Sequence, residues 1–330
     1  SSGIIKMKAV LVLLVVLLPQ VSLGYEIFDV RLPDSEMGYQ NSVYIITDYN
    51  YPLGEVTSFR TLARVTSLRM GGQFEPGVRQ LNSGVTNITV EMPAMWSPDY
   101  NNRIYFGNTF RPAPTYGIHS FVASSRTKEM HVTFRLALRD ENKGRIRSED
   151  LRIDNFKEWT GSVNQFIRYY AKVAHHSGAD EIALAPELVE TLCLSPSELV
   201  AASSLIRQYY GGRIRFDFTS MYNPQLVERC LAGISASFDS IAIEPGKNPS
   251  VSEITQILRS GKLIAKLALT GSADEQLKKA DTLSQIPGFS NAFVTWGSVY
   301  MDPHFGGMSD SSEAFFDKPL GKFLDKWFQR

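Results

Sequence analysis

The sequence predicts an α/β protein folded as a (β/α)8 TIM barrel. Between residues 130 and 296, short apolar runs alternate with segments of helical spacing, at intervals of roughly 25–30 residues. A chain of 330 residues has room for eight such units. The doubly wound alternative needs a glycine-rich first turn between strand and helix, and this sequence shows none.

Each expected strand is a short apolar run bounded by turn residues. Strand one has two alternatives, residues 25–32 and residues 43–47. Strands two to eight follow in order at residues 86–92, 132–138, 182–185, 214–218, 240–243, 263–269 and 292–296. No linker divides the chain, so we expect one barrel domain over residues 25–330, with irregular insertions at 33–85 and 97–116.

Helix signals follow the strands in order. Residues 163–174 have their apolar positions at helical spacing after strand three. Ser195-Pro-Ser-Glu198 predicts a capping box after strand four, and Ser272-Ala-Asp-Glu275 predicts another after strand seven. The remaining helices are expected from Asn223-Pro224 to near Gly233, over residues 252–261 and over residues 315–328.

The composition limits the partners and the compartment. Basic and acidic residues balance at 34 each, so neither nucleic acid nor an anionic membrane is the expected partner. Met7 and Lys8 precede an apolar run at residues 9–18 and small residues at 22–24, which is the pattern of a secretory signal peptide. Such a run is short for a bilayer span. We therefore expect residues 1–24 to be leader and signal peptide, and the protein to be secreted without a membrane anchor after signal removal.

Secretion places the two cysteines, Cys193 and Cys230, in an oxidising environment. Each follows a predicted strand, so a disulfide is one interpretation and two buried free thiols are the other. Asn87-Ile-Thr is the one glycosylation sequon, and it overlaps strand two. His175 and His176 lie away from the apolar face of their helix, which favours a solvated pair over a metal site. No metal or cofactor is expected.

Residues 182–187 carry the strongest functional signal. Ile182 to Ala185 form a continuous apolar run, as in a parallel strand covered on both faces, and Glu187 follows directly after its end. In a barrel the catalytic groups lie at the C-terminal ends of the strands. Glu187 is therefore the leading candidate for a catalytic carboxylate. Its alternative is a structural role, in which it caps a helix or pairs with an arginine.

The stretch from Trp159 to Leu188, WTGSVNQFIRYYAKVAHHSGADEIALAPEL, resembles glycoside hydrolase family 113, the β-mannanase-type TIM barrels. That family carries a tryptophan, a helix with Tyr-Ala, and an apolar strand that ends on a glutamate. Segments 205–214 and 238–243 are also similar to the family, and the resemblance covers roughly residues 118–245. It implies a glycoside-hydrolase-like barrel that acts on a β-linked oligo- or polysaccharide, with Glu187 in the place of the general acid/base.

Two positions depart from the family pattern. The family's nucleophile is a glutamate at the end of strand seven, where this chain has Leu269, and Pro186 replaces the polar residue before the acid/base. Retaining hydrolysis needs a second carboxylate about 5–5.5 Å from the first, whereas inverting hydrolysis uses about 6.5–9.5 Å. Glu244, at the end of strand six, is the best substitute and is expected at the wider separation. Weaker candidates are Asp140, Asp217 and Asp302.

Sugar sites combine carboxylates with aromatic and polar side chains. Trp96 after strand two, Tyr222 after strand five and Trp296 at the end of strand eight are predicted to line the mouth of the barrel. Trp296 also resembles the strand-eight tryptophan of related barrels, and the alternative for Trp96 and Trp296 is that they only fill space at the barrel mouth. Arg135 and Arg139 share one face of strand three, where they would hold a substrate group or neutralise the strand-four glutamate.

The expected partner is a carbohydrate or another small-molecule ligand. One hypothesis is a secreted glycoside hydrolase acting on a β-linked oligo- or polysaccharide, with Glu187 as general acid/base. The alternative is a non-hydrolytic descendant of that fold, which binds carbohydrate or another ligand or runs an unrelated chemistry in the same pocket. Leu269 favours the alternative, whereas Glu187 and Trp296 favour hydrolysis.

Overall fold

The computed structural model describes residues 87–96, 103–106, 122–123, 125–127, 130–140, 144–221, 223–232, 238–289, 292–296, 308–309, 311–312 and 318–327. The expected leader and signal peptide, both alternatives for strand one and the insertion at 33–85 lie outside these residues. Within the described part, no helix combines the length and the apolar character needed to cross a membrane.

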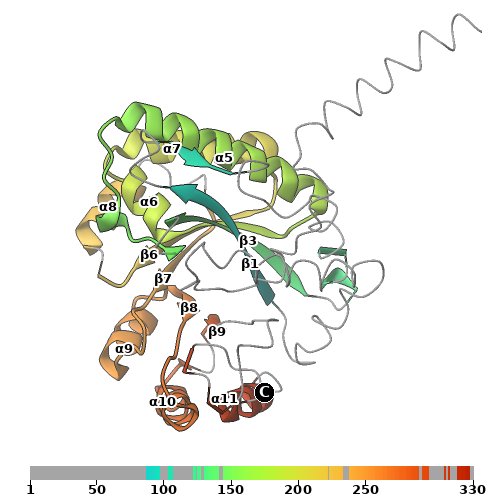
Figure 1. Ribbon diagram of the computed structural model, residues 1–330, viewed down its shortest axis with the longest axis vertical. Helices are drawn as coiled ribbons and strands as arrows, with labels where there is room; N and C mark the ends of the chain where they lie inside the picture. The colour runs from blue at the N-terminus through green and yellow to red at the C-terminus, as the bar shows by residue number, and fades with distance from the viewer. Residues whose placement is uncertain are drawn as a thin grey trace, which may run out of the picture.

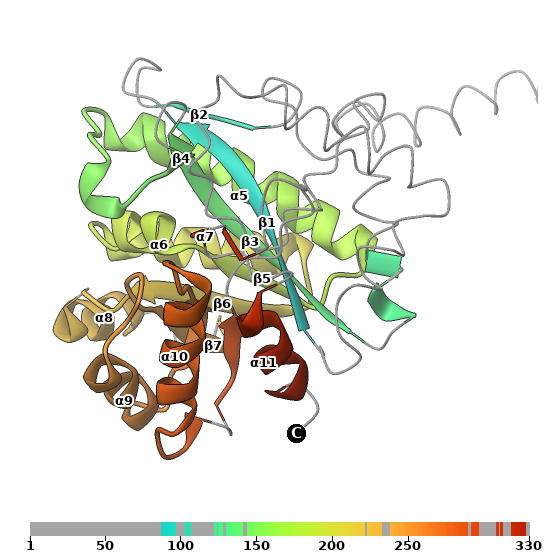
Figure 2. The same ribbon diagram turned by 60° about the horizontal axis from the view of Figure 1, so that its bottom comes forward.

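One curled sheet forms the centre of the fold (Figures 1 and 2). Its parallel strands are β1 (Asn87–Trp96), β3 (His131–Asp140), β5 (Glu181–Leu184), β6 (Arg213–Thr219), β7 (Ser240–Glu244), β8 (Leu263–Leu267) and β9 (Val294–Trp296). They lie side by side in sequence order. Two short strands, β2 (Ile104–Tyr105) and β4 (Gly144–Arg145), pair antiparallel with β1 and β3.

From β3 onward, helices alternate with the parallel strands and cover the outer face of the sheet (Figure 1). They are α5 (Phe156–Ser177), α6 (Pro186–Leu192), α7 (Pro196–Tyr209), α8 (Pro224–Leu231), α9 (Val251–Arg259), α10 (Ala273–Ser284) and α11 (Pro319–Trp327), with the short 3-10 helix η6 (Ser148–Asp150) before α5. Strands two to eight of the sequence prediction correspond to the seven parallel strands, and the (β/α)8 fold class is confirmed. Strand one, expected between β9 and β1, lies outside the described residues.

The helix caps show how well local sequence signals predict boundaries. The predicted capping box at Ser272 and Glu275 is present at the start of α10, with each side chain bonded to the other's backbone N–H. Asn223 caps α8 as expected, by accepting from the backbone of Gln225 at 2.9 Å. The capping box predicted at Ser195 is wrong, because its hydroxyl contacts the Ser197 hydroxyl instead of the helix backbone.

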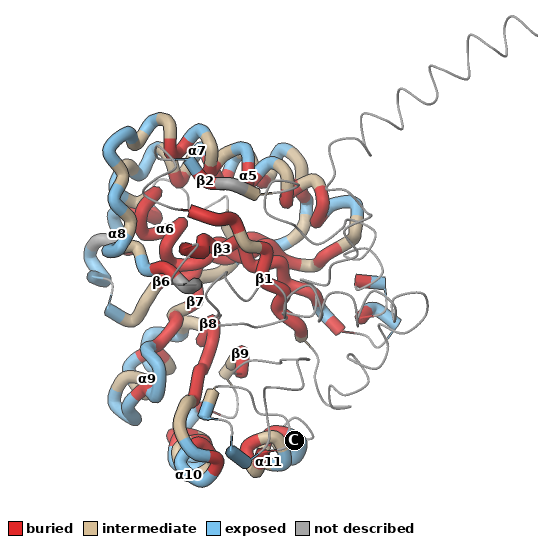
Figure 3. The backbone as a smooth tube through the Cα atoms, in the orientation of Figure 1, coloured by how far each residue is buried: buried red, intermediate tan, exposed pale blue. Residues whose placement is uncertain are grey.

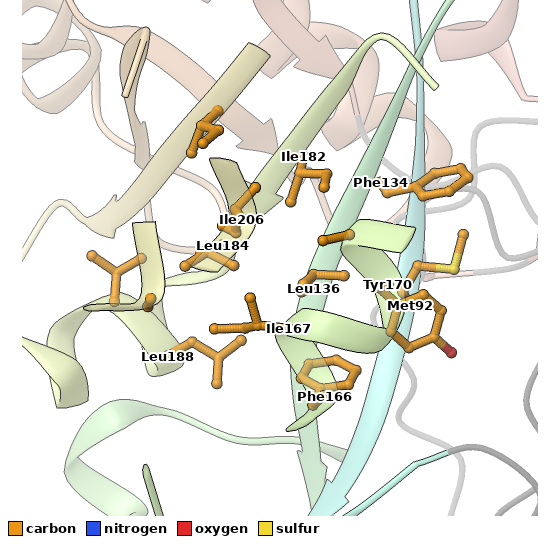
Figure 4. Packing of buried hydrophobic residues seen from close by; sticks show 14 of the residues in the cluster. Met92, Phe134, Leu136, Phe166, Ile167, Tyr170, Ile182, Leu184, Leu188 and Ile206 are labelled. Atoms are coloured by element: carbon orange, nitrogen blue, oxygen red, sulfur yellow. The ribbon is translucent and has the colours of Figure 1, made fainter. Parts of the chain in front are cut away.

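Two hydrophobic clusters hold the helices against the sheet. The first cluster joins β1, β3, β5 and β6 to α5, α6, α7 and α8, and Figure 4 shows Phe166, Ile167 and Tyr170 of α5 packed beside the strand residues Leu136 and Leu184. The second cluster joins β8 and β9 to α9, α10 and α11. Buried residues follow the sheet and the sheet-facing sides of the helices (Figure 3), so the core lies between these two layers.

Candidate functional site

Alternate residues of the parallel strands point to opposite sides of the sheet, and this places a charged set on its concave face. On β3, Val132, Phe134, Leu136 and Leu138 belong to the first cluster and face the helices. The odd-numbered residues between them therefore face inward. The neighbouring strands alternate in the same way. The buried charged residues that face inward on β3 and its neighbours are Glu91, Arg135, Arg139, Glu181, Arg215, Asp217 and Glu244.

Arg135 is the centre of this inward set. Its Nη1 donates to Glu91 Oε2 at 3.2 Å and its Nε to Asp217 Oδ2 at 3.1 Å. Its Nη2 bonds the carboxylate of Glu244. One guanidinium on β3 thus holds carboxylates from β1, β6 and β7, which draws three strands of the curled sheet together.

Two further arginines extend the ion pairs. Arg139 bonds the second oxygen of Glu91, and Arg215 bonds Asp217 and Glu181, each at 2.7 Å. Burial by itself lowers the pKa of Arg135, but its carboxylate neighbours, led by Asp217, outweigh this effect and raise the pKa above its ordinary value. The pKa of Arg215 is raised for the same reasons. These guanidinium groups therefore stay charged at every physiological pH.

Glu187 lies on α6, in the first turn after β5, and is 4% exposed. Its Oε1 accepts from the backbone N–H of Leu138 at 2.7 Å. The C=O groups of Val132 and Leu136 accept from the N–H groups of Asp180 and Ala185, which flank β5, and the β3–β5 register ends at Leu136, before Leu138. The Glu187 carboxylate continues the ladder by one step, and its charge also acts on Arg135. The expected position after strand four is confirmed, and the side chain has a structural bond there.

The other carboxylate candidates differ in position and in their bonding partners. Glu244 and Asp217 lie inward, and each is bonded to Arg135, on which the charge of Glu187 also acts. Asp140, the last residue of β3, is 8% exposed. Asp302 and the aromatic candidate Tyr222 lie outside the described residues. Among the carboxylates predicted from the sequence, Glu244 and Asp217 are therefore the ones that share Arg135 with Glu187.

Two alternative roles were predicted for Arg135 and Arg139. Sequence reasoning assigned Arg135 and Arg139 either to a substrate group or to the neutralisation of Glu187. The bonds of both residues go to protein carboxylates, chiefly Glu91, and Arg135 interacts with Glu187 through charge. Arg135 thus offsets the charge of Glu187 and of three other carboxylates, Arg139 bonds Glu91, and contact of either arginine with a substrate stays a prediction.

The two tryptophan predictions need correction. Trp96 has the same parity as Ile88, Val90 and Met92, so it faces the helices and lies in the first cluster, 2% exposed. Trp296 packs against Phe289, Phe323 and Trp327, with ring centroids 6.0, 6.4 and 6.2 Å away. Both rings fill the outer layer between sheet and helices, where large aromatic side chains bury the most surface, and neither lies on the inward face.

Leu269 stands two residues beyond the end of β8, at the position expected for a nucleophile. It is 1% exposed and belongs to the second cluster, with side chains of α9, α10 and α11. The residue is apolar and contacts the helical layer, so this end of β8 provides no carboxylate at that position.

Cys193 and Cys230 form a disulfide, with their Cα atoms 5.4 Å apart, which confirms the bridge over the free thiols. Asn87 is the first residue of β1 and is half-buried, and its glycosylation stays a prediction. His175 and His176 are exposed in the last turn of α5, as expected. Among the described residues, no group of three or more His, Cys, Asp or Glu side chains could hold a metal ion.

Sequence reasoning missed six buried charged residues among those described: Glu91, Glu181, Glu190, Arg215, Lys266 and Lys318. A signal for Arg215 was available, because Arg213-Ile-Arg-Phe-Asp-Phe218 alternates charged and apolar residues along a strand. Glu190 has no comparable signal, since its role depends on contacts with η6 and β6 that the sequence does not indicate.

No protein-family model and no curated protein matches this chain by sequence. Solved structures share its fold. A GH113 β-1,4-mannanase aligns with a TM-score of 0.62 at 10% identity, covering 77% of this chain and 92% of the mannanase. A GH113 β-mannanase from Alicyclobacillus acidocaldarius, solved in complex with ManMIm, gives 0.62 at 12% identity, with coverage of 77% and 90%. The chain therefore has a divergent GH113-like barrel fold.

Proposed function

We propose that the protein is a secreted carbohydrate-binding barrel, derived from a glycoside-hydrolase scaffold, that holds a β-linked oligo- or polysaccharide at the C-terminal ends of its strands without cleaving it. One observation carries the proposal: the inward carboxylates beside Glu187 are bonded to arginines, and the strand-seven position holds Leu269 in an apolar cluster. Double displacement needs a second carboxylate in reach of the anomeric carbon. The fold supports the ligand class, because the solved barrels of this type include β-mannanases.

Glu187 is the residue we place at the ligand. It lies just beyond the C-terminal end of β5, where barrels of this architecture bind their substrates, and its carboxylate is an acceptor for sugar hydroxyls. Secretion is part of the proposal. The disulfide between Cys193 and Cys230 supports it, since such bridges persist in oxidising compartments.

Hydrolysis with Glu187 as general acid/base is the second candidate, and Glu244 is the observation that favours it. Glu244 ends β7, two strands from β5, and both carboxylates interact with Arg135. A pair at this spacing suits the wider separation of inverting enzymes. In that mechanism Glu187 protonates the leaving oxygen and Glu244 activates water.

The two candidates are separated by measuring binding and cleavage on one panel of β-linked mannan, galactan and xylan oligosaccharides. Calorimetry gives the affinity, and chromatography of the incubated sugars gives cleavage. Binding without products supports the proposal. Products of inverted configuration that disappear in Glu187→Gln, a loss of about 10²–10⁴-fold in rate, establish the second candidate. Glu228→Gln, an exposed change on α8, is the matched control. Absence of both binding and cleavage contradicts both.

A further inference from the structure

The short helix that carries Glu187 has no exposed residue in the described structure. All seven residues of α6 are buried, and two of them, Glu187 and Glu190, are carboxylates that are 4% and 3% exposed. Buried carboxylates need partners, because an unbonded charge in the interior is strongly unfavourable. The bonds of these two side chains therefore decide where α6 sits on the sheet.

Glu190 bonds two separate elements. Its Oε1 accepts from the backbone N–H of Thr219 at 2.6 Å and from the Thr219 hydroxyl at 2.8 Å. Its Oε2 accepts from the hydroxyl of Ser148 in η6. Thr219 is the last residue of β6, and its partner in the β6–β7 register is Glu244. Glu190 thus holds the backbone directly beside the second carboxylate candidate.

Glu187 and Glu190 are three residues apart on one helix, so their side chains lie on neighbouring positions of the same face. Glu187 bonds the end of β3 through Leu138, and Glu190 bonds the end of β6 through Thr219. One helical turn therefore spans the gap left where β5 ends between those strands. The disulfide attaches the other end of α6, at Cys193, to α8.

We propose that Glu190 is a positioning residue, which fixes α6 across the ends of β3 and β6 and so sets Glu187 in place relative to Glu244. The effect of this positioning on ligand binding rests on the proposed function. The positioning of α6 itself does not need a ligand. Burial raises the pKa of Glu190, and hydrogen bonds from Ser148 and Thr219 oppose this effect. Glutamine is therefore the conservative replacement, since its amide oxygen still accepts from Thr219 and its NH2 donates to Ser148.

Hydrogen exchange of backbone amides tests the positioning without any ligand. In Glu190→Ala, the Thr219 amide loses its acceptor, and we expect the Leu138 amide, which Glu190 does not touch, to exchange at least about tenfold faster as well. Glu190→Gln should restore both. The Val132 amide is the internal control, because Asp180 holds it at the other end of β3 at 2.8 Å. If the alanine variant does not fold, Glu190→Asp, which shortens the reach, replaces it.

The outcomes are distinct. Faster exchange at Thr219 with Leu138 unchanged overturns the proposal, because Glu190 then acts locally. Equal acceleration at Val132 also overturns it, because this marks a global loss of stability. Asp180→Ala is the matched variant and should accelerate Val132 while leaving Leu138 unchanged.

Ligand affinity is the second readout. Glu190→Ala should weaken binding of the best oligosaccharide in the panel by about tenfold or more, and Glu190→Gln should retain it. Should the wild-type protein bind no sugar, the proposed function fails, while the exchange experiment still decides the role of Glu190. Should the wild-type protein bind and Glu190→Ala bind equally well, the positioning proposal fails and the proposed function stands.

Discussion

Two arcs of the curled sheet differ in what they place on each side. The first arc, β1 to β7 with α5 to α8, combines an apolar outer face with buried ion pairs on its inward face. The second arc, β8 and β9 with α9 to α11, has its own apolar cluster, which contains Leu269 and Trp296. Both arcs pack helices on strands in the same way. What distinguishes the first arc is the set of buried ion pairs on its inward face.

This contrast shows which part of the sheet carries ionisable side chains near Glu187. In the first arc Glu187, Glu244 and Asp217 gather around Arg135. In the second arc the strand end that would supply a nucleophile is used for packing. A nucleophile at the end of β8, as in the family that the sequence resembles, would need a carboxylate from the second arc, whereas an inverting pair of Glu187 and Glu244 would lie within the first arc. The described structure therefore concentrates its inward carboxylates in the first arc, where arginines bond them.

The largest expected effect comes from removing the centre of the first arc. Arg135→Met leaves the carboxylates of Glu91, Asp217 and Glu244 without their shared guanidinium, and we expect a loss of about 3–5 kcal/mol in the free energy of unfolding. Urea denaturation measures it. Arg103→Met is the control, because its partner Glu158 is partly exposed and Arg103 itself is 61% exposed, so the loss should stay below about 1 kcal/mol. Similar losses in both variants would contradict the importance of the inward set.

The second arc is tested by Leu269→Ala, which opens a cavity among α9, α10 and α11. The expected loss is about 2–5 kcal/mol, with no change in ligand affinity because the side chain faces away from the concave side. Thermal or urea unfolding, together with calorimetry on the sugar panel, checks both statements. A variant with full stability but altered binding would place Leu269 in the ligand site and remove the contrast between the arcs.

The disulfide belongs to the first arc and closes a loop of sequence separation 37. Replacing Cys193 and Cys230 with serine should cost about 2–4 kcal/mol, chiefly through the freedom that the unfolded chain regains. Unfolding curves of the wild-type protein with and without reductant provide the comparison. If reduction leaves the unfolding midpoint unchanged, the bridge contributes nothing to the first arc.

The smallest effect concerns pH. Since burial raises the pKa of Glu190, the folded protein binds this proton more tightly than the unfolded chain does. The stabilising contribution is complete below the ordinary glutamate pKa and is lost as pH rises through the raised value. Glu190→Gln should therefore become more stable relative to wild type between mildly acidic and neutral pH. A constant difference across that range would show that Glu190 does not cause the dependence.

Local signals predicted much of the fold. Apolar runs and caps placed seven strands, the box at Ser272 and the Asn223 cap, because these features depend on residues within a few positions. Glu187 was placed for the same reason, directly after a buried run. Trp96 could have been assigned to the outer face, because it lies an even number of residues from Met92 on the same strand. Strand β9 is three residues long, so its alternation is too short to orient Trp296.

The sequence by itself determined the alternation of strands and helices and the position of Glu187 at a strand end, since hydrophobic period and strand length are local properties. Tertiary structure decided which carboxylates share Arg135, which cysteine interpretation holds, and that Glu190 reaches Thr219 and Ser148. These contacts join residues far apart in the chain. They follow from the register between parallel strands and from the curvature of the sheet, and neither is encoded in any single segment.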